Sequence, residues 1–186
     1  MKKIFRSFVL AIALFAGANS LMAQDYIRET DRQTGHPLLH GEITFADLLH
    51  ESTCAWLGSG AADYRGNADA IAGIKQLQGN YRFVLFVGTW CEDTQIVLPQ
   101  FLSVMRQSGI PQSAITMYGV NRSKKALNQE EVRFNITRVP TIIVLNQNRE
   151  IGRITESVST SVENDIYTMM AQDQKVLENR KAARGL

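Results

Sequence analysis

A cysteine follows a predicted buried strand and precedes a predicted helix, within residues 88–94, whose sequence is GTWCEDT. In such an arrangement the backbone N–H groups of the first helical turn point at the Cys91 sulfur, and the helix dipole favours negative charge there. Both effects stabilise the thiolate, the nucleophilic form of cysteine, whereas the carboxylates of Glu92 and Asp93 oppose it. Because residues just past the carboxyl end of a strand face the open edge of a sheet, the position favours a reactive Cys91 over a buried, inert one.

A second cysteine, Cys54, lies upstream among small residues. Two cysteines permit one pair but do not place it. A structural Cys54–Cys91 bridge, a transient resolving bridge and two free thiols are all compatible with the sequence, and two thiols without a stable bridge are favoured.

The histidines His36, His40 and His50 lack the tight ligand spacing of a metal site, so we expect exposed or hydrogen-bonded histidines and no metal.

The overall composition excludes several classes of protein. A chain of 186 residues with 13 Gly, 4 Pro and 2 Cys is not collagen-like, low-complexity or disulfide-dense, and its length is typical of one domain. The formal net charge of +2, without a run of basic residues, gives no argument for a nucleic-acid partner. Phosphate-binding glycine loops and Ser/His/Asp arrangements are absent, so no cofactor is expected.

Residues 1–23 are typical of a secretory signal peptide. A basic start without acids precedes an unbroken apolar run over 8–16 and a small-residue exit. Cleavage after Ala23 is favoured, with Ala18 and Ser20 as alternative sites. An uncleaved membrane anchor is disfavoured, because the apolar run is shorter than the ~20 residues that a span needs.

Removal of this segment leaves 17 basic against 18 acidic residues, so the mature chain carries a net charge of −1. We therefore expect an exported protein, periplasmic or secreted, with no stable membrane span after signal removal. Disulfides form and persist in such compartments.

Hydrophobic periodicity and turn residues predict the elements that must position Cys91. Strands are expected over 81–88, 114–120, 141–145 and 150–155, and helices over 45–51, 68–78, 92–107, 124–134 and 161–180. Residues 24–41 are predicted as an extended leader, and the Gly- and Ala-rich residues 52–67 give no assignment. The order β-α-β-α-β-β-α after an irregular N-terminal part predicts an α/β domain with a mixed sheet.

Over residues 80–180 the sequence resembles the thioredoxin family. The resemblance rests on the run FVLFVGTWC, on the following helix with Pro99 inside, and on RVPT leading into the strand TIIVL. It implies a thioredoxin-like fold, a mixed central sheet flanked by helices, over residues 80–186. Residues 24–79 are then an irregular and helical N-terminal extension.

The resemblance also implies the roles of four residues. Cys91 opens the redox helix, and Pro140 is cis and lies against its sulfur. Trp90 flanks the site, and Val139 offers backbone hydrogen bonds to the main chain of a bound peptide.

Two departures from the family pattern matter for function. The family motif is Cys-x-x-Cys, but Thr94 occupies the second cysteine position. Thr94 could hydrogen-bond the Cys91 sulfur, but it cannot resolve a mixed disulfide. Leu85 stands near the place where thioredoxins bury an acid. The sequence is therefore that of a monothiol variant and not of a general disulfide reductase.

Two functions follow as hypotheses. In the first, the protein is an exported thiol-disulfide oxidoreductase in which Cys91 attacks a disulfide of a client protein or peptide. An external thiol, a redox partner protein or Cys54 then resolves the adduct. In the second, it is a non-catalytic thioredoxin-fold module that holds an extended peptide between Trp90 and the Val139–Pro140 pair.

Overall fold

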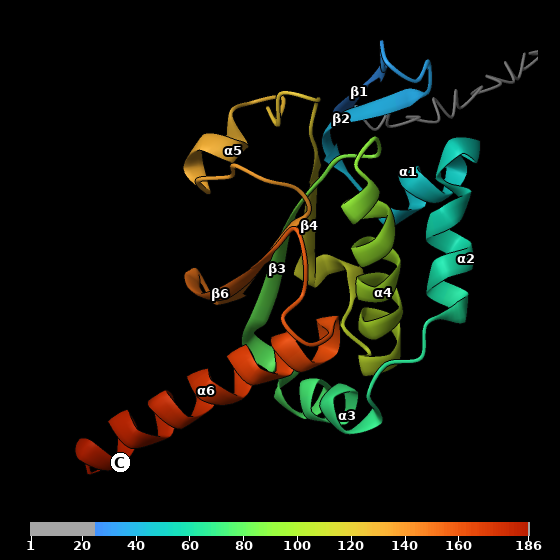
Figure 1. Cartoon of the computed structure of the whole chain (residues 1–186). Coiled ribbons are helices and arrows are strands. Elements are labelled where there is room, and N and C mark those ends of the chain that lie inside the picture. Colours follow the sequence, from blue (N-terminus) through green and yellow to red (C-terminus); the bar gives the residue numbers. More distant parts are fainter. Residues whose placement is uncertain (1–24, 186) are drawn as a thin grey trace, which may run out of the picture.

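A six-stranded mixed sheet forms the centre of the structure, a computed structural model that describes residues 25–185 (Figure 1). The segment expected as a signal peptide, residues 1–23, lies outside the described residues. The strands are β1 (Tyr26–Thr30), β2 (Pro37–Ile43), β3 (Tyr81–Val87), β4 (Ile115–Gly119), β5 (Thr141–Asn146) and β6 (Arg149–Thr155). They lie in the order β1-β2-β4-β3-β5-β6, and β3 and β4 pair in parallel while the other neighbours are antiparallel. The expected fold class, a mixed α/β sheet flanked by helices, is confirmed.

The helices are α1 (Phe45–His50), α2 (Ala55–Asp63), α3 (Ala68–Leu77), α4 (Glu92–Ser108), α5 (Glu130–Arg133) and α6 (Val162–Ala183), with 3-10 turns over Ser52–Cys54, Gln78–Asn80 and Gln112–Ala114. Two helix starts follow the predicted capping. Thr44 and Asp47 form a reciprocal capping box before α1. The side chain of Asn67 accepts a hydrogen bond from the backbone of Ala70 at the start of α3. No helix within residues 25–185 has the length and apolar character to cross a membrane.

The central strand β3 is buried along almost its whole length because β4 and β5 flank it and helices cover it. Leu85 of β3 lies opposite Met117 of β4 on one side and opposite Ile142 of β5 on the other. All three side chains are buried and apolar. Leu85, which stands near the place where thioredoxins bury an acid, therefore lies in an apolar environment. Nearly continuous apolar runs are typical of strands covered on both faces.

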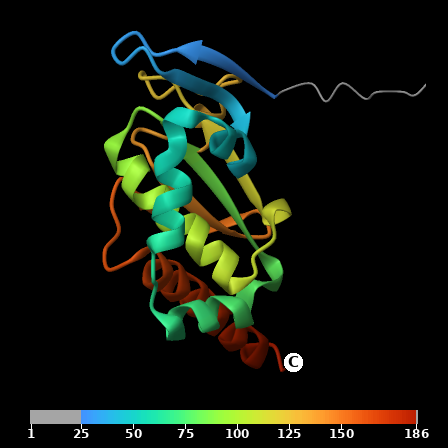
Figure 2. The same ribbon diagram turned by 90° about the vertical axis from the view of Figure 1, so that its right-hand side faces the viewer.

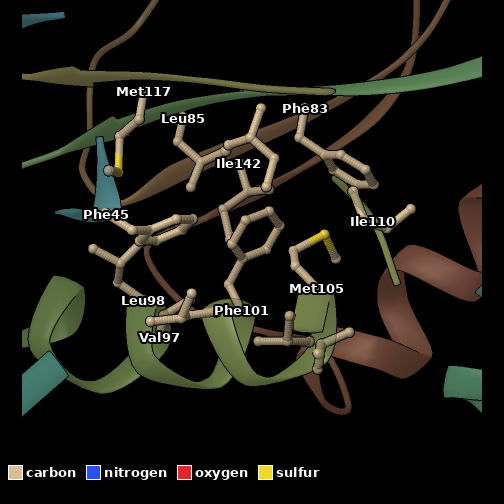
Figure 3. Packing of buried hydrophobic residues seen from close by; sticks show 14 of the residues in the cluster. Phe45, Phe83, Leu85, Val97, Leu98, Phe101, Met105, Ile110, Met117 and Ile142 are labelled. Carbon is tan, nitrogen blue, oxygen red and sulfur yellow. The ribbon is translucent and has the colours of Figure 1, made fainter. Parts of the chain in front are cut away.

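Helix α4 packs against one face of the sheet and carries the larger hydrophobic cluster (Figure 3). Its Phe101 ring meets Phe83 of β3 nearly edge-on, with ring centroids 5.6 Å apart. Gly109, in the left-handed region at φ 75°, ends the helix. Since α4 starts directly after Cys91, this packing fixes the start of the helix relative to the end of β3.

The two faces of the sheet are covered unequally (Figures 1 and 2). Helices α2, α3, α4 and α6 gather on the face that carries the larger cluster, and α2 runs beside α4. The opposite face carries a smaller cluster, closed by α5 and the connection 120–140. The smaller cluster consists of Val84, Phe86, Tyr118, Val120, Ala126, Ile136, Val139 and Ile143.

The N-terminal part differs from the prediction. Residues 24–41 were expected as an extended leader, but most of them belong to the hairpin β1–β2, whose second strand pairs with β4. The strand β1 is largely exposed and polar, so it lacks the alternation that would reveal it in the sequence.

The unassigned residues 52–67 contain α2. Gly60 lowers the helix propensity there, but a Cβ at this position would lie 2.8 Å from Pro99 of α4, so the close packing of the two helices requires glycine.

The helix expected over 124–134 is also wrong, since only Glu130–Arg133 is helical. Lys124 and Gln129 have φ values of 60° and 63°, which lie outside the right-handed helical region. The carboxylate of Glu131 accepts a hydrogen bond from the backbone N–H of Ala126. The segment is thus a loop that its own side chains hold in place.

Candidate thiol site

Cys91 lies between the end of β3 and the start of α4 and is partly exposed. It is the N-cap residue of α4, with an extended backbone, and its N–H donates to the carbonyl of Gly88 at 2.9 Å. The Cys91 thiol donates to the backbone carbonyl of Val139 at 3.3 Å. The sequence prediction of a cysteine at the junction between strand and helix is confirmed.

The loop before β5 forms the opposite side of the site. The Val139–Pro140 peptide bond is cis, the isomer that the resemblance implies. The loop is fixed on both sides, since the hydroxyl of Thr141 donates to the carbonyl of Arg138 at 2.8 Å and the Glu156 N–H donates to the carbonyl of Pro140 at 2.8 Å. The carbonyl that faces the sulfur therefore belongs to a rigid turn.

Trp90 precedes the cysteine and packs against the smaller cluster, as Cys91 does. Its indole Nε1–H donates to the carbonyl of Val120 at 3.1 Å, and the guanidinium of Arg122 lies over the ring at 5.2 Å from its centroid. A Cβ on Gly88 would lie 2.7 Å from the indole, so only glycine leaves room for the ring in this position. Trp90 is thus placed beside the thiol, as the resemblance implies.

Thr94 is completely buried in the first turn of α4. Its hydroxyl oxygen accepts a long hydrogen bond, 3.4 Å, from the backbone N–H of Gly88. The sulfur of Cys91 has its hydrogen bond with Val139, and the Thr94 hydroxyl has its bond with Gly88. Thr94 supports the loop through this bond to Gly88.

Cys54 and Cys91 are both free thiols. Cys54 is buried in the larger cluster, whereas Cys91 packs against the smaller cluster on the other face of the sheet. Burial raises the pKa of the Cys54 thiol, which disfavours the nucleophilic form. Two thiols without a stable bridge therefore stay the prediction for this pair.

Cys54 also reaches a cavity of about 70 Å³ next to Trp90. The cavity lies between the turn of the β1–β2 hairpin, the start of α2 and the loop that carries Trp90. Its lining residues are Asp31, Thr34, His36, Pro37, Thr53, Cys54, Thr89, Trp90 and Gln95.

The three histidines do not meet. His36 and His50 are exposed, and His50 Nδ1 lies 2.7 Å from the carbonyl of Ala46. His40 is buried on β2 with Nδ1 2.9 Å from the Glu29 carboxylate. Within residues 25–185, His, Cys, Asp and Glu side chains form no group of three or more that could hold a metal ion.

Sequence reasoning missed two charged residues at the site, Asp31 and Arg122. Asp31 lies in the turn between β1 and β2, and Arg122 follows β4. Their side chains form two parallel hydrogen bonds of 2.7 and 2.6 Å. No sequence signal links them, because 91 positions separate them along the chain.

Comparisons with known proteins give limited similarity. No family model and no curated protein matches the chain. Among solved structures, the chain is similar to a protein of unknown function from Pseudomonas aeruginosa, with 17% identity, 70% of this chain and 82% of that chain covered, and a TM-score of 0.49.

The chain is also similar to the germline-specific thioredoxin Deadhead from Drosophila melanogaster, with 20% identity, 53% of this chain and 86% of that chain covered, and a TM-score of 0.36. An HIV epitope scaffold has 20% identity over 74% of this chain and 99% of its own, with a TM-score of 0.33. All three TM-scores are below 0.5.

Proposed function

We propose that the protein is an exported, thioredoxin-like thiol-disulfide oxidoreductase that acts on protein disulfides through the single nucleophile Cys91. The observation that carries the proposal is the position of Cys91 at the start of α4, partly exposed, with its sulfur 3.3 Å from the carbonyl of the cis Val139–Pro140 loop. The export context rests on the signal-peptide pattern of residues 1–23.

The proposed reaction begins with attack of the Cys91 thiolate on one sulfur of a client disulfide. A bond forms between Cys91 and that sulfur while the client S–S bond breaks, and the departing client sulfur takes the electron pair and then a proton. The result is a mixed disulfide between Cys91 and the client.

Thr94 cannot complete the reaction, because a hydroxyl does not displace a thiol from a disulfide. A small external thiol, such as glutathione, therefore attacks the sulfur of Cys91 and releases the second client sulfur as a thiol. A second external thiol then attacks the glutathione sulfur of the new mixed disulfide, which returns Cys91 to the thiol and forms oxidised glutathione. The net reaction reduces one client disulfide and oxidises two external thiols.

The first experiment is thiol alkylation by iodoacetamide at pH 7 in the Cys54→Ala variant, where Cys91 is the single thiol. We expect Cys91 to react faster than free glutathione under the same conditions. A rate no faster than that of glutathione would contradict the catalytic proposal.

The second experiment uses insulin with added glutathione. Wild-type protein should accelerate insulin reduction, and Cys91→Ser should remove the acceleration while Cys54→Ala keeps it. If Cys54→Ala also abolished the activity, Cys54 would be the resolving thiol in place of glutathione.

A second candidate function is a peptide-binding module without redox chemistry. The buried Thr94 favours it, because the residue fills the position of the second sulfur and supports the loop through Gly88. In that case Cys91→Ser should bind an extended peptide as tightly as wild type does, and insulin reduction should be absent in both.

A further inference from the structure

The indole of Trp90 packs against the smaller cluster and is also held by polar contacts. One side of its surroundings contains the 70 Å³ cavity, so side chains do not fill the space next to the ring. Its remaining anchors are the hydrogen bond to Val120, the close approach of Gly88 and the guanidinium of Arg122 over the ring. The Arg122 side chain is the anchor that could move, because it is long and has many rotamers.

Asp31 removes this freedom from Arg122. Both carboxylate oxygens of Asp31 accept from the guanidinium, in the two-pronged geometry that fixes the plane of an arginine. Asp31 is itself held by the hydroxyl of Thr34 at 2.7 Å and the backbone N–H of Gln33 at 3.1 Å. The carboxylate is 4% exposed, whereas the Arg122 side chain is 31% exposed, so the buried acid holds a partly exposed guanidinium.

The charge state of this pair is stable. The hydrogen bonds from Arg122 hold the pKa of the Asp31 carboxyl well below its usual range, so the carboxylate stays ionised at neutral pH. A chain of contacts therefore runs from the hairpin turn through Asp31 and Arg122 to the Trp90 ring.

We infer that Asp31 and Arg122 are positioning residues for the thiol site, and that they hold the Trp90 indole in place for a client polypeptide that docks beside Cys91. The inference rests on the proposed function of Cys91. It makes the turn of the β1–β2 hairpin, which lies outside the thioredoxin resemblance, a part of the site.

The physical basis is the cost of ordering a side chain on binding. An indole that is already fixed adds contact area without losing rotamer freedom when a client docks, whereas a released indole must first be ordered. Immobilising one side chain costs enough to slow or weaken docking by about two- to tenfold. A small reagent reacts without docking, so its rate does not depend on whether the indole is already ordered.

The test uses a Trp56→Phe background, in which Trp90 is the remaining tryptophan of the two in the chain. Three variants are compared in it: Arg122→Gln, Arg122→Lys and Asp31→Asn. Acrylamide quenching of Trp90 fluorescence should rise in all three, because the ring loses its anchor. The rate of insulin reduction with glutathione should fall by about two- to tenfold.

Alkylation of Cys91 by iodoacetamide should stay within about twofold of the background in the same variants, because this small reagent needs no ordered indole. A purely electrostatic effect of Arg122 on the thiol would slow both reactions equally, and Arg122→Lys would then behave as the background does. Either result would overturn the inference.

Arg28→Gln is the matched control. Arg28 lies on β1 of the same hairpin and makes a comparable two-pronged pair with Glu51, at 2.6 and 3.1 Å. Loss of this pair should leave quenching and insulin reduction unchanged, so an effect equal to that of Arg122→Gln would mean that the hairpin is only structural.

Two further comparisons distinguish failure of the positioning inference from failure of the proposed function. In a Trp90→Ala background, Arg122→Gln should cause no additional loss of insulin reduction, and an undiminished loss there would contradict positioning through Trp90. If the unsubstituted protein reduces no insulin at all, the proposed function fails, whereas the quenching series still decides whether Asp31 and Arg122 hold the ring.

Discussion

The thiol of Cys91 and the carbonyl oxygen of Val139 are joined by a hydrogen bond of 3.3 Å, although 48 positions separate them in the chain. The bond connects the start of α4 to the loop before β5. Because Val139 accepts this bond, it occupies one side of the Cys91 sulfur and limits the directions from which a second sulfur can approach.

Thr94→Cys should convert the protein to dithiol chemistry. Position 94 lies one helical turn from Cys91, on the same face of α4. The buried N–H of Gly88 loses its hydroxyl acceptor, so the substitution should cost about 1–3 kcal/mol of the free energy of unfolding. Under oxidising conditions the variant should form an internal disulfide, which mass spectrometry detects. Its reduced form should reduce insulin once without added glutathione.

The control for this conversion is Cys91→Ser in the Thr94→Cys background, which should remove all activity. If no internal disulfide forms, the two side chains are not within bridging reach. If the bridge forms but insulin is not reduced, the binding-module function is correct.

Cys54 should be protected from reagents in the folded protein. It is 3% exposed, and burial raises its pKa, so both access and ionisation disfavour its reaction. Iodoacetamide at pH 8 should label one cysteine per chain, identified as Cys91 by peptide mapping, and the second only after urea is added. Equal labelling of Cys54 and Cys91 without urea would contradict the burial of Cys54.

Asp31 should make the fold sensitive to acid. The pKa of its carboxyl is lowered in the folded state, chiefly by the hydrogen bonds from Arg122, relative to about 3.9 in the unfolded chain. Its contribution to stability is therefore complete above the unfolded pKa and is lost as the pH falls toward the folded pKa.

Urea unfolding at pH 7 and pH 3 tests this. Asp31→Asn should lower the free energy of unfolding at pH 7, and the difference from wild type should shrink at pH 3. Asp63→Asn, at an exposed carboxylate of α2, is the control and should show neither effect. A difference that is the same at both pH values would exclude the ion pair as its source.

Tyr81 should make the fold sensitive to alkali. Its hydroxyl donates to the carbonyl of Met170 at 3.2 Å and to the buried carboxylate of Asp173 at 3.1 Å. Burial, followed by the nearby Asp173 charge, raises the pKa of Tyr81 to about 12. The stabilising effect of the neutral phenol is thus full below the unfolded pKa of about 10 and is lost as the pH rises through the folded value.

Tyr81→Phe should lower the free energy of unfolding at pH 7 by about 1–3 kcal/mol, because Asp173 loses a buried donor. The difference from wild type should decrease between pH 10 and pH 12, as measured by urea unfolding. Tyr167→Phe, at a more exposed tyrosine of α6, provides the control. A difference between Tyr81→Phe and wild type that does not change with pH would contradict the raised pKa.

The sequence predicted accurately the elements in which apolar side chains form a continuous run or recur at helical spacing. The run over 81–88 and the spacing of Val97, Phe101 and Met105 are local signals, and both β3 and α4 lie within one residue of the predicted bounds. The placement of Cys91 between them followed directly. Pro140 before an apolar strand was likewise visible as a local pattern.

The missed features depend on distant contacts. The strand β1 is stabilised by its pairing with β2 and has little apolar character of its own, so no period reveals it. Asp31 belongs to a turn whose partner Arg122 lies beyond four intervening helices in the chain. The expected helix over 124–134 had suitable residues, but side-chain bonds such as that from the Ala126 N–H to the Glu131 carboxylate favour the loop.

The unequal cover of the sheet has a consequence for amide hydrogen exchange. Segments with few buried apolar contacts open with less free energy than a packed core does. The connection 120–140 contains one helical turn and closes the smaller cluster, so its amides should exchange with deuterated solvent before those of β3 and α4. The turn of Val139 and Pro140 is held by the hydrogen bonds from Thr141 and Glu156, so the carbonyl that faces Cys91 should stay in place while the rest of the connection opens.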